Sequence, residues 1–146
     1  RKDVYGSDKE YSFCYPPKNP GSRHVAVFEA PIDALSHATL QKLEGWQWNG
    51  YRLSLGGTSP VALVAFLERH PEITRVALYL DNDLAGRVNA RKIKALLKSD
   101  QRFSKIRVSV NPPRSGKDYN EKLQRTLQAI REEKHASRQK QAAVSI

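Results

Sequence analysis

The chain has 146 residues, which is enough for one domain with a hydrophobic core and a small appendage. Its 25 lysines and arginines outnumber its 15 acids, so the net charge of +10 predicts a polyanionic partner, nucleic acid before a membrane surface. No apolar run approaches membrane-spanning length, and the single cysteine, Cys14, excludes an internal disulfide and a cysteine-cluster zinc site, so we expect a cytoplasmic protein.

Residues 1–23 are polar and rich in turn-forming residues. Within them, Tyr11, Phe13 and Tyr15 alternate with polar residues, and this pattern predicts a short strand. The chain contains no methionine and opens abruptly, so we expect a piece of a longer protein. On that view residues 1–23 form an N-terminal extension or the end of an upstream module.

The apolar run 25–28 predicts a first buried strand, and Glu29 stands at its carboxyl end. Pro31 opens the following helix at a position where the missing N–H costs nothing, and Gly45 ends it. Asp33 falls in the first turn, where the helix dipole favours a carboxylate. The apolar stripe expected to face the core is Ile32, Leu35, Ala38, Thr39 and Leu43.

A second strand is predicted over 51–55, followed by a helix, and a third over 76–80. The third strand ends in two carboxylates, Asp81 and Asp83. Two acids at the end of a buried strand repel each other and lose hydration, and Mg²⁺ relieves both costs because it prefers oxygen ligands. Taken alone, the pair is explained equally well by a metal site and by a turn followed by a helix N-cap.

The next predicted helix, residues 84–98, carries a row of four basic residues spaced four, three and four apart. This spacing places them on one face, which we expect to contact phosphates, although a solvated helix face is the ordinary explanation of such a row. The four residues are Arg87, Arg91, Lys94 and Lys98.

The fourth predicted strand, 105–110, leads into a basic loop that contains Arg114, Lys117 and Asp118. Asp118 with Glu121 fits a capping box for the last helix, which gives Asp118 a purely structural alternative. That helix is expected to turn Leu123, Leu127 and Ile130 inward. Residues 131–146 are polar and are expected to be a fraying helix end or tail.

Strands that alternate with helices predict an α/β domain, with a four-stranded parallel sheet and helices on both faces. We number the predicted strands along the chain and expect the order 2-1-3-4. In such sheets ligands bind outside the carboxyl ends of the strands. Because strands one and three would then be neighbours, Glu29 should face Asp81 and Asp83 across one crevice, with Lys117 and Asp118 at the end of strand four.

The segment Glu29-Ala-Pro-Ile-Asp33, together with Asp81-Asn-Asp83-Leu-Ala-Gly86, resembles the Toprim domain of DnaG-type primases, type IA and type II topoisomerases and some nucleases. The form Asp-x-Asp-x-Ala-Gly-Arg is most similar to the primase branch. The segments 28–36 and 116–120 resemble primase-like proteins of plasmids and other mobile elements. The chain departs from primases at Ala30, where they usually carry Gly, and at Asn120, where they tend to have a second acid.

The resemblance implies a Rossmann-like Toprim catalytic domain over residues 24–130 that binds Mg²⁺, with Mn²⁺ as a substitute. It also implies that Glu29 is a metal ligand or a general acid/base, and that Lys117 and Arg114 neutralise phosphate. The expected site residues are Glu29 and Lys117 for catalysis; Glu29, Asp81, Asp83 and Asp118 for metal; Arg87, Arg91, Lys94, Lys98 and Arg114 for nucleic acid; and Asp33 and Asn120 in support.

The function that this resemblance implies is primer synthesis: Mg²⁺-dependent nucleotidyl transfer from nucleotides, on a single-stranded DNA template, in plasmid or mobile-element replication. A Toprim nuclease, and a non-catalytic basic module whose acids only cap helices, are the alternatives. A topoisomerase is disfavoured because its tyrosine lies in another domain. A phosphatase would carry its Asp-x-Asp on the first strand, and a phosphoacceptor receiver domain would not need this net charge.

Overall fold

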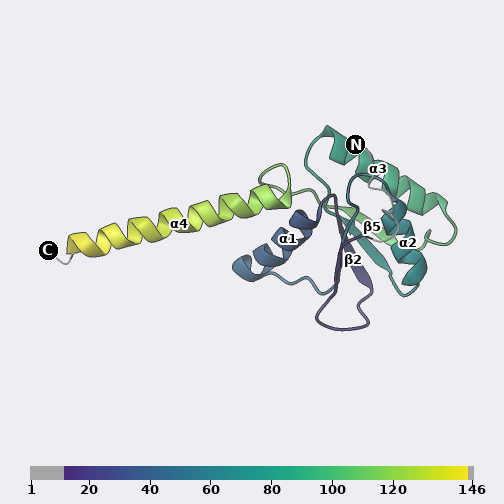
Figure 1. Ribbon diagram of the computed structural model, residues 1–146, viewed down its shortest axis with the longest axis horizontal. Coiled ribbons are helices and arrows are strands. Elements are labelled where there is room, and N and C mark those ends of the chain that lie inside the picture. The colour runs from purple at the N-terminus through teal and green to yellow at the C-terminus, as the bar shows by residue number, and fades with distance from the viewer. Residues whose placement is uncertain (1–11, 145–146) are drawn as a thin grey trace, which may run out of the picture.

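The structure is a computed structural model that describes residues 12–144 (Figure 1). Its centre is a sheet in which β2, β3, β4 and β5 are parallel, and four helices complete the fold. The elements in chain order are β1 (Cys14–Tyr15), β2 (His24–Phe28), α1 (Pro31–Glu44), β3 (Tyr51–Ser54), α2 (Val61–Arg69), β4 (Arg75–Leu78), α3 (Leu84–Ser99), β5 (Arg107–Val110) and α4 (Tyr119–Val144).

The sheet order is β1-β3-β2-β4-β5, so the predicted order of the four parallel strands is confirmed. The predicted number of strands was wrong by one, because β1 adds a fifth, antiparallel strand at the edge of β3. Its backbone satisfies edge groups of β3: the Ser54 N–H donates to the Phe13 carbonyl at 2.8 Å. β1 falls in the segment where Tyr11, Phe13 and Tyr15 predicted a short strand, although only Cys14 and Tyr15 pair and Tyr11 lies outside the described residues.

Helices cover both faces of the sheet, as predicted. On one face α2 and α3 bury a large aliphatic core over residues such as Val27, Leu53 and Leu78. On the other face α1 and α4 enclose a smaller cluster around Phe28 and Tyr119. The two faces therefore differ in kind: one is large and mainly aliphatic, and the other is small, aromatic and partly polar.

The predicted inward stripe of α1 was wrong. Ile32 and Leu35 are 52% and 41% exposed, and the helix instead buries Asp33, Ser36 and His37 beside Ala34 and Leu40. The reason lies in β3, where Leu53 and Leu55 pack in the aliphatic core while the alternate residues, Arg52 and Ser54, are buried outside it. Polar strand residues on the α1 face require polar partners, so α1 turns its polar side inward.

The helix α4 lies against α1 at its first turns and then projects away from the body of the domain (Figure 1). Leu123 packs against the aromatic cluster, whereas Leu127 is 39% exposed, so only part of the predicted inward row is buried. The helix continues through the polar segment where fraying was expected and ends at Val144. Within residues 12–144, no helix is both long and apolar enough to cross a membrane.

Candidate metal centre

Four acidic residues meet at the carboxyl edge of the sheet. β2 and β4 are neighbours with Val27 opposite Leu78, so Glu29 and Asp81, which follow these strands, emerge side by side. Asp33 comes from the first turn of α1, and Asp118 immediately precedes α4. Segments that are far apart in the chain thus supply acids to one place, as the predicted sheet order requires.

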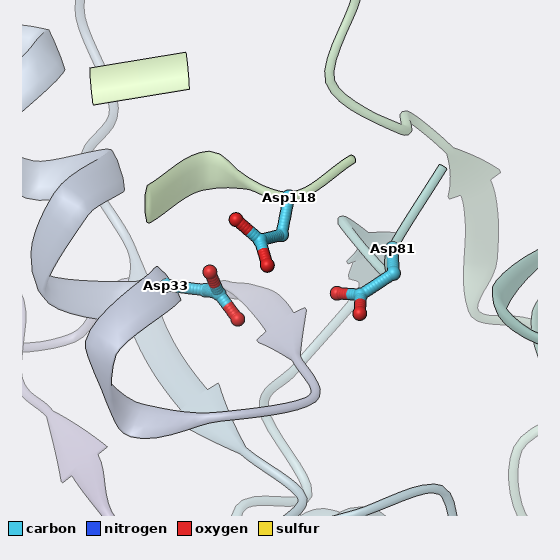
Figure 2. Close-up of side chains that lie close together, drawn as sticks. All are labelled: Asp33, Asp81 and Asp118. Carbon is cyan, nitrogen blue, oxygen red and sulfur yellow. The ribbon is translucent and has the colours of Figure 1, made fainter. Parts of the chain in front are cut away.

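Three of these acids face one another in Figure 2. One carboxylate oxygen from each of Asp33, Asp81 and Asp118 lies within 4.8 Å of the other two. Asp33 is only 4% exposed, and the other two are half-buried. Three oxygen donors at this spacing form a donor set that suits a hard divalent cation.

Glu29 lies beside this group, and the described residues only partly satisfy its carboxyl group. Its Oε1 is the one buried side-chain polar atom without a hydrogen-bond partner among the described residues. Burial, and then the negative charge of Asp81, raise the pKa of Glu29 to about 7, although the Asp81 backbone amide opposes the shift. A buried carboxyl oxygen without a partner is free to bind a cation, and no ion pair of Glu29 with a basic side chain is found among residues 12–144.

The neighbouring aspartates are perturbed in the same direction. Burial raises the pKa of Asp33 to about 6, with Asp118 and Asp81 adding to the shift and the Asn120 amide opposing it. Burial also raises the pKa of Asp81, followed by the charges of Asp118 and Asp83, while Lys117 opposes. Raised pKa values on several neighbouring acids mark a place where negative charge is concentrated without an equal positive charge.

Asp83 also lies at this edge, and its side chain takes part in the fold. Its Oδ1 caps α3 by accepting a hydrogen bond from the Gly86 N–H at 2.7 Å, and its Oδ2 lies 3.6 Å from Lys117 Nζ. The structural alternative for Asp83 is therefore realised, and the group of three carboxylates contains Asp33 in its place. A direct bond from Asp83 or Glu29 to the metal stays a prediction.

Asp118 combines both interpretations. Its Oδ1 accepts a hydrogen bond from the Glu121 N–H at 2.8 Å, which is the expected N-cap bond, while Glu121 Oε2 accepts from the N–H of Lys117 at 3.4 Å, one residue before the cap. The same side chain belongs to the group of three carboxylates. The cap thus fixes the backbone that presents Asp118 to the site.

Gly86 allows α3 to begin directly against Asp81. A Cβ atom at residue 86 would lie 1.9 Å from the Asp81 carbonyl oxygen, which is far inside van der Waals contact. Only glycine permits this approach without moving the backbone of Asp81. The glycine of the Asp-x-Asp-x-Ala-Gly segment is therefore a packing requirement of the site.

Two asparagines hold the site together. Asn82 joins the turn to the basic loop: its N–H donates to the Lys117 carbonyl, and its Nδ2 donates to the Pro113 carbonyl at 3.2 Å. The Asn120 N–H donates to Asp33 Oδ1 at 3.1 Å, which fits its predicted supporting role. Sequence reasoning missed Asn82, although its place between the two aspartates was a usable signal.

The basic residues predicted to contact nucleic acid are all exposed. Arg87 lies in the second turn of α3, next to the acidic edge, where its Nη1 donates to Asn82 Oδ1 at 3.3 Å. The remaining residues of the row follow along α3 away from this edge, and Arg114 lies on the loop before α4. Contact of this row with nucleic acid stays a prediction.

Comparison with known proteins gives one family match. The Toprim-like family model matches residues 26–123, more than half of the chain, and this range contains every residue of the acidic centre. Among proteins with curated descriptions, none matches the chain.

Two similar solved structures contain primase domains. The primase fragment of the bacteriophage T7 primase-helicase protein is 26% identical, with a TM-score of 0.46 over 68% of this chain and 38% of that chain. A structure of the T7 lagging-strand DNA polymerase interacting with primase domains of two gp4 subunits, bound to an RNA/DNA hybrid and dTTP, is 27% identical. Its TM-score is 0.45 over 68% of this chain and 46% of that chain. This chain therefore covers less than half of the length of each of the two matched chains.

Proposed function

Because the chain belongs to the Toprim-like family, we propose that it catalyses Mg²⁺-dependent nucleotidyl transfer and synthesises primers on a single-stranded DNA template. The observation that carries the proposal is the uncompensated acidic centre: a buried Glu29 oxygen without a partner among the described residues, beside three converging carboxylates. The primase form of the Asp81–Arg87 segment favours synthesis over the other Toprim reactions.

The donor set fits a divalent cation, since it consists of carboxylate oxygens only. Asp33, Asp81 and Asp118 would hold the ion, with Glu29 beside them. When bound, Mg²⁺ supplies neutralisation of the charge that develops on the phosphoryl oxygens. Mn²⁺ has the same preference for oxygen ligands and would substitute.

The protein's own groups supply the remaining chemistry. A carboxyl whose pKa is about 7 is suited to accept a proton from an attacking 3′-hydroxyl at neutral pH, and Glu29 has this property. Lys117 and Arg114 are exposed cations beside the acidic centre and would neutralise the phosphates of the incoming nucleotide. The basic row on α3 would bind the template through its phosphates.

The proposal extends to the setting of the reaction. The resemblance of segments 28–36 and 116–120 to plasmid-borne proteins favours a role in the replication of a mobile element, in the cytoplasm. A primase also needs modules that select the template and hold the growing primer, so we propose that further domains of a longer chain act with this one. The net charge of +10 supports nucleic acid as the common partner.

The test incubates the protein with labelled single-stranded DNA, nucleotides and Mg²⁺, and compares it with Glu29→Gln and with Glu133→Gln. Glu133 is an exposed acid on the projecting part of α4, so its variant controls for the loss of one charge. We expect short primers from the protein and from Glu133→Gln, and none from Glu29→Gln. Shortening of the DNA without primers would instead identify a Toprim nuclease, and activity that survives Glu29→Gln combined with Asp81→Asn would exclude this site.

A further inference from the structure

A second charged site lies on the α1 face of the sheet, away from the acidic centre. It is a pocket of about 160 Å³ between the segment 15–19, the second half of α1 and the segment 47–49, with Arg52 of β3 in its wall. We propose that this Arg52 pocket binds a phosphate group. The proposal is independent of the proposed reaction, because the pocket shares no lining residue with the acidic centre.

The first argument is the burial of an unpaired charge. Arg52 is only 5% exposed, and among residues 12–144 no carboxylate forms an ion pair with it. Burying a charge without a counter-charge is strongly unfavourable. A ligand anion would supply the missing charge.

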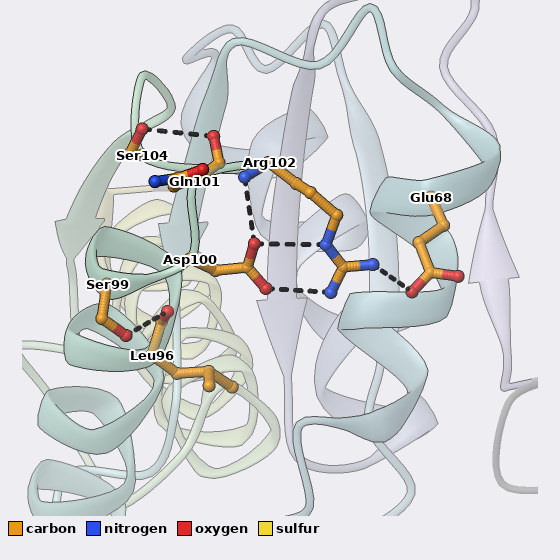
Figure 3. Close-up of polar contacts among 7 residues, drawn as sticks. All are labelled: Glu68, Leu96, Ser99, Asp100, Gln101, Arg102 and Ser104. Carbon is orange, nitrogen blue, oxygen red and sulfur yellow. Dashed lines mark hydrogen bonds and ion pairs between the residues drawn. The ribbon is translucent and has the colours of Figure 1, made fainter.

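The same chain pairs another arginine fully. Arg102 has a side chain that is 56% exposed, yet it contacts both Asp100 and Glu68 at 2.9 Å (Figure 3). An exposed guanidinium gains little from such pairing, whereas a buried one gains a great deal. The absence of an acid beside Arg52 in the described part of the chain therefore points to a counter-ion that comes from outside.

The second argument is the set of groups around the guanidinium. Its Nε donates to His37 Nδ1 at 3.0 Å, its Nη2 donates to Gln41 Oε1, and its Cζ lies 5.9 Å from the centre of the Tyr15 ring. Burial and the charge of Arg52 lower the pKa of His37 to about 3, so the imidazole is neutral. All of these partners orient the guanidinium, and none of them carries a negative charge.

One nitrogen of the guanidinium is left for a ligand. Within residues 12–144 the hydrogen bonds of the guanidinium use Nε and Nη2, and none is found for Nη1. Arg52 lines the pocket, which gives Nη1 access to a group bound there. A phosphate oxygen is a strong acceptor for such a donor.

The third argument is the lining of the pocket. Lys18 and Lys42 are exposed residues of its wall, the amides of Gln41, Gln47 and Asn49 add donors, and none of the residues 12–144 that line it is acidic. The volume of about 160 Å³ is smaller than the roughly 300–1,000 Å³ of pockets that enclose drug-sized ligands. The pocket therefore accommodates one phosphate group, either a free ion or the phosphate of a nucleotide whose remainder lies outside.

Binding can be followed through Trp48, which lines the pocket and is one of two tryptophans in the chain. The protein is titrated in EDTA with inorganic phosphate or with AMP, against sodium chloride at equal ionic strength. We expect a saturable change in tryptophan fluorescence and a rise in melting temperature. Tighter binding of AMP identifies a nucleotide phosphate as the ligand, and binding of phosphate but not AMP identifies the free ion.

Three variants assign the effect to the pocket. Arg52→Gln, and the double variant Lys18→Gln/Lys42→Gln, should each weaken binding about tenfold or more. The double variant changes only exposed residues, so it keeps the test valid if Arg52→Gln fails to fold. Lys134→Gln/Lys140→Gln removes the same charge from the exposed part of α4 and should bind normally. Phosphate and AMP that act no differently from chloride, or equal weakening by both double variants, would overturn the proposal.

Discussion

The two edges of the sheet differ in how their charged side chains are paired. At the amino edge the Arg102 guanidinium donates two hydrogen bonds, of 2.9 and 3.1 Å, to Asp100 and a third to Glu68 (Figure 3). The hydrogen bonds from Arg102 lower the pKa of Asp100. At the carboxyl edge the pKa values of Glu29, Asp33 and Asp81 are all raised. Charges that serve the fold alone are paired, and the surplus of acid at the other edge indicates a cation that the chain does not contain.

The largest effect on activity should come from removing one acid of the group at the carboxyl edge. Asp81→Asn takes a donor from the group of three carboxylates, and we expect primer synthesis to fall about 100-fold or more, since even outer-shell partners of a metal contribute 10–100-fold. Rates are measured at saturating Mg²⁺, with circular dichroism to confirm folding. Asp100→Asn, which removes an acid from the paired edge, should keep its rate. Equal losses in both variants would contradict the difference between the two edges.

A methyl group at residue 86 should damage the acidic edge through the backbone. Gly86→Ala places Cβ 1.9 Å from the Asp81 carbonyl oxygen, so the turn must move, and we expect a loss of about 1–3 kcal/mol in the free energy of unfolding. Urea denaturation measures it. Ala85→Ser adds one heavy atom at the exposed neighbouring position and should change stability by less than about 0.5 kcal/mol. A Gly86→Ala protein as stable as the original would show that the close approach is absent.

Without metal, the acidic edge should make stability depend on pH. Glu29 and Asp33 have ordinary pKa values of 4.5 and 3.8 and reach about 7 and 6 in the fold. The folded protein therefore binds more protons than the unfolded chain between pH 4 and 7, and stability is lost as the pH rises through this window. Melting temperatures in EDTA should fall across it, and less steeply in Glu29→Gln. A melting temperature that rises over the same window, in EDTA, would refute the raised pKa values.

The smallest effect should come from the paired edge. Arg102→Ala removes exposed ion pairs, which contribute little to stability, so we expect only a small fall in melting temperature. Mg²⁺ affinity, measured by isothermal titration calorimetry, should not change. A large loss of affinity would mean that the two edges are coupled, contrary to the separation described above.

The sequence was sufficient for the sheet order and the meeting of Glu29 with Asp81, because alternating strands and helices restrict the topology to few possibilities. It was not sufficient for the buried face of α1. An apolar stripe predicts the inward face only when the surface beneath it is apolar, and β3 presents Arg52 and Ser54 there. The same rotation of α1 buries Asp33, a residue predicted only as a supporting group.

The sequence was also not sufficient to predict what each individual acid does. Asp83 and Asp118 both precede helices and both form an N-cap, so the local pattern cannot tell which of the two also joins the group of three carboxylates. Their difference depends on where the loop before α4 comes to lie. That loop is held by Asn82, whose two hydrogen bonds to it are with residues more than 30 positions away.

The central claim is that acids from β2, β4, α1 and the loop before α4 share one divalent cation. A crystal structure of the protein soaked in Mn²⁺, with anomalous data, tests it directly. The account predicts an anomalous peak between Asp33, Asp81 and Asp118, adjacent to Glu29. Data of good quality with no peak there, and with the carboxylates bonded to Lys117 or to one another instead, would contradict it.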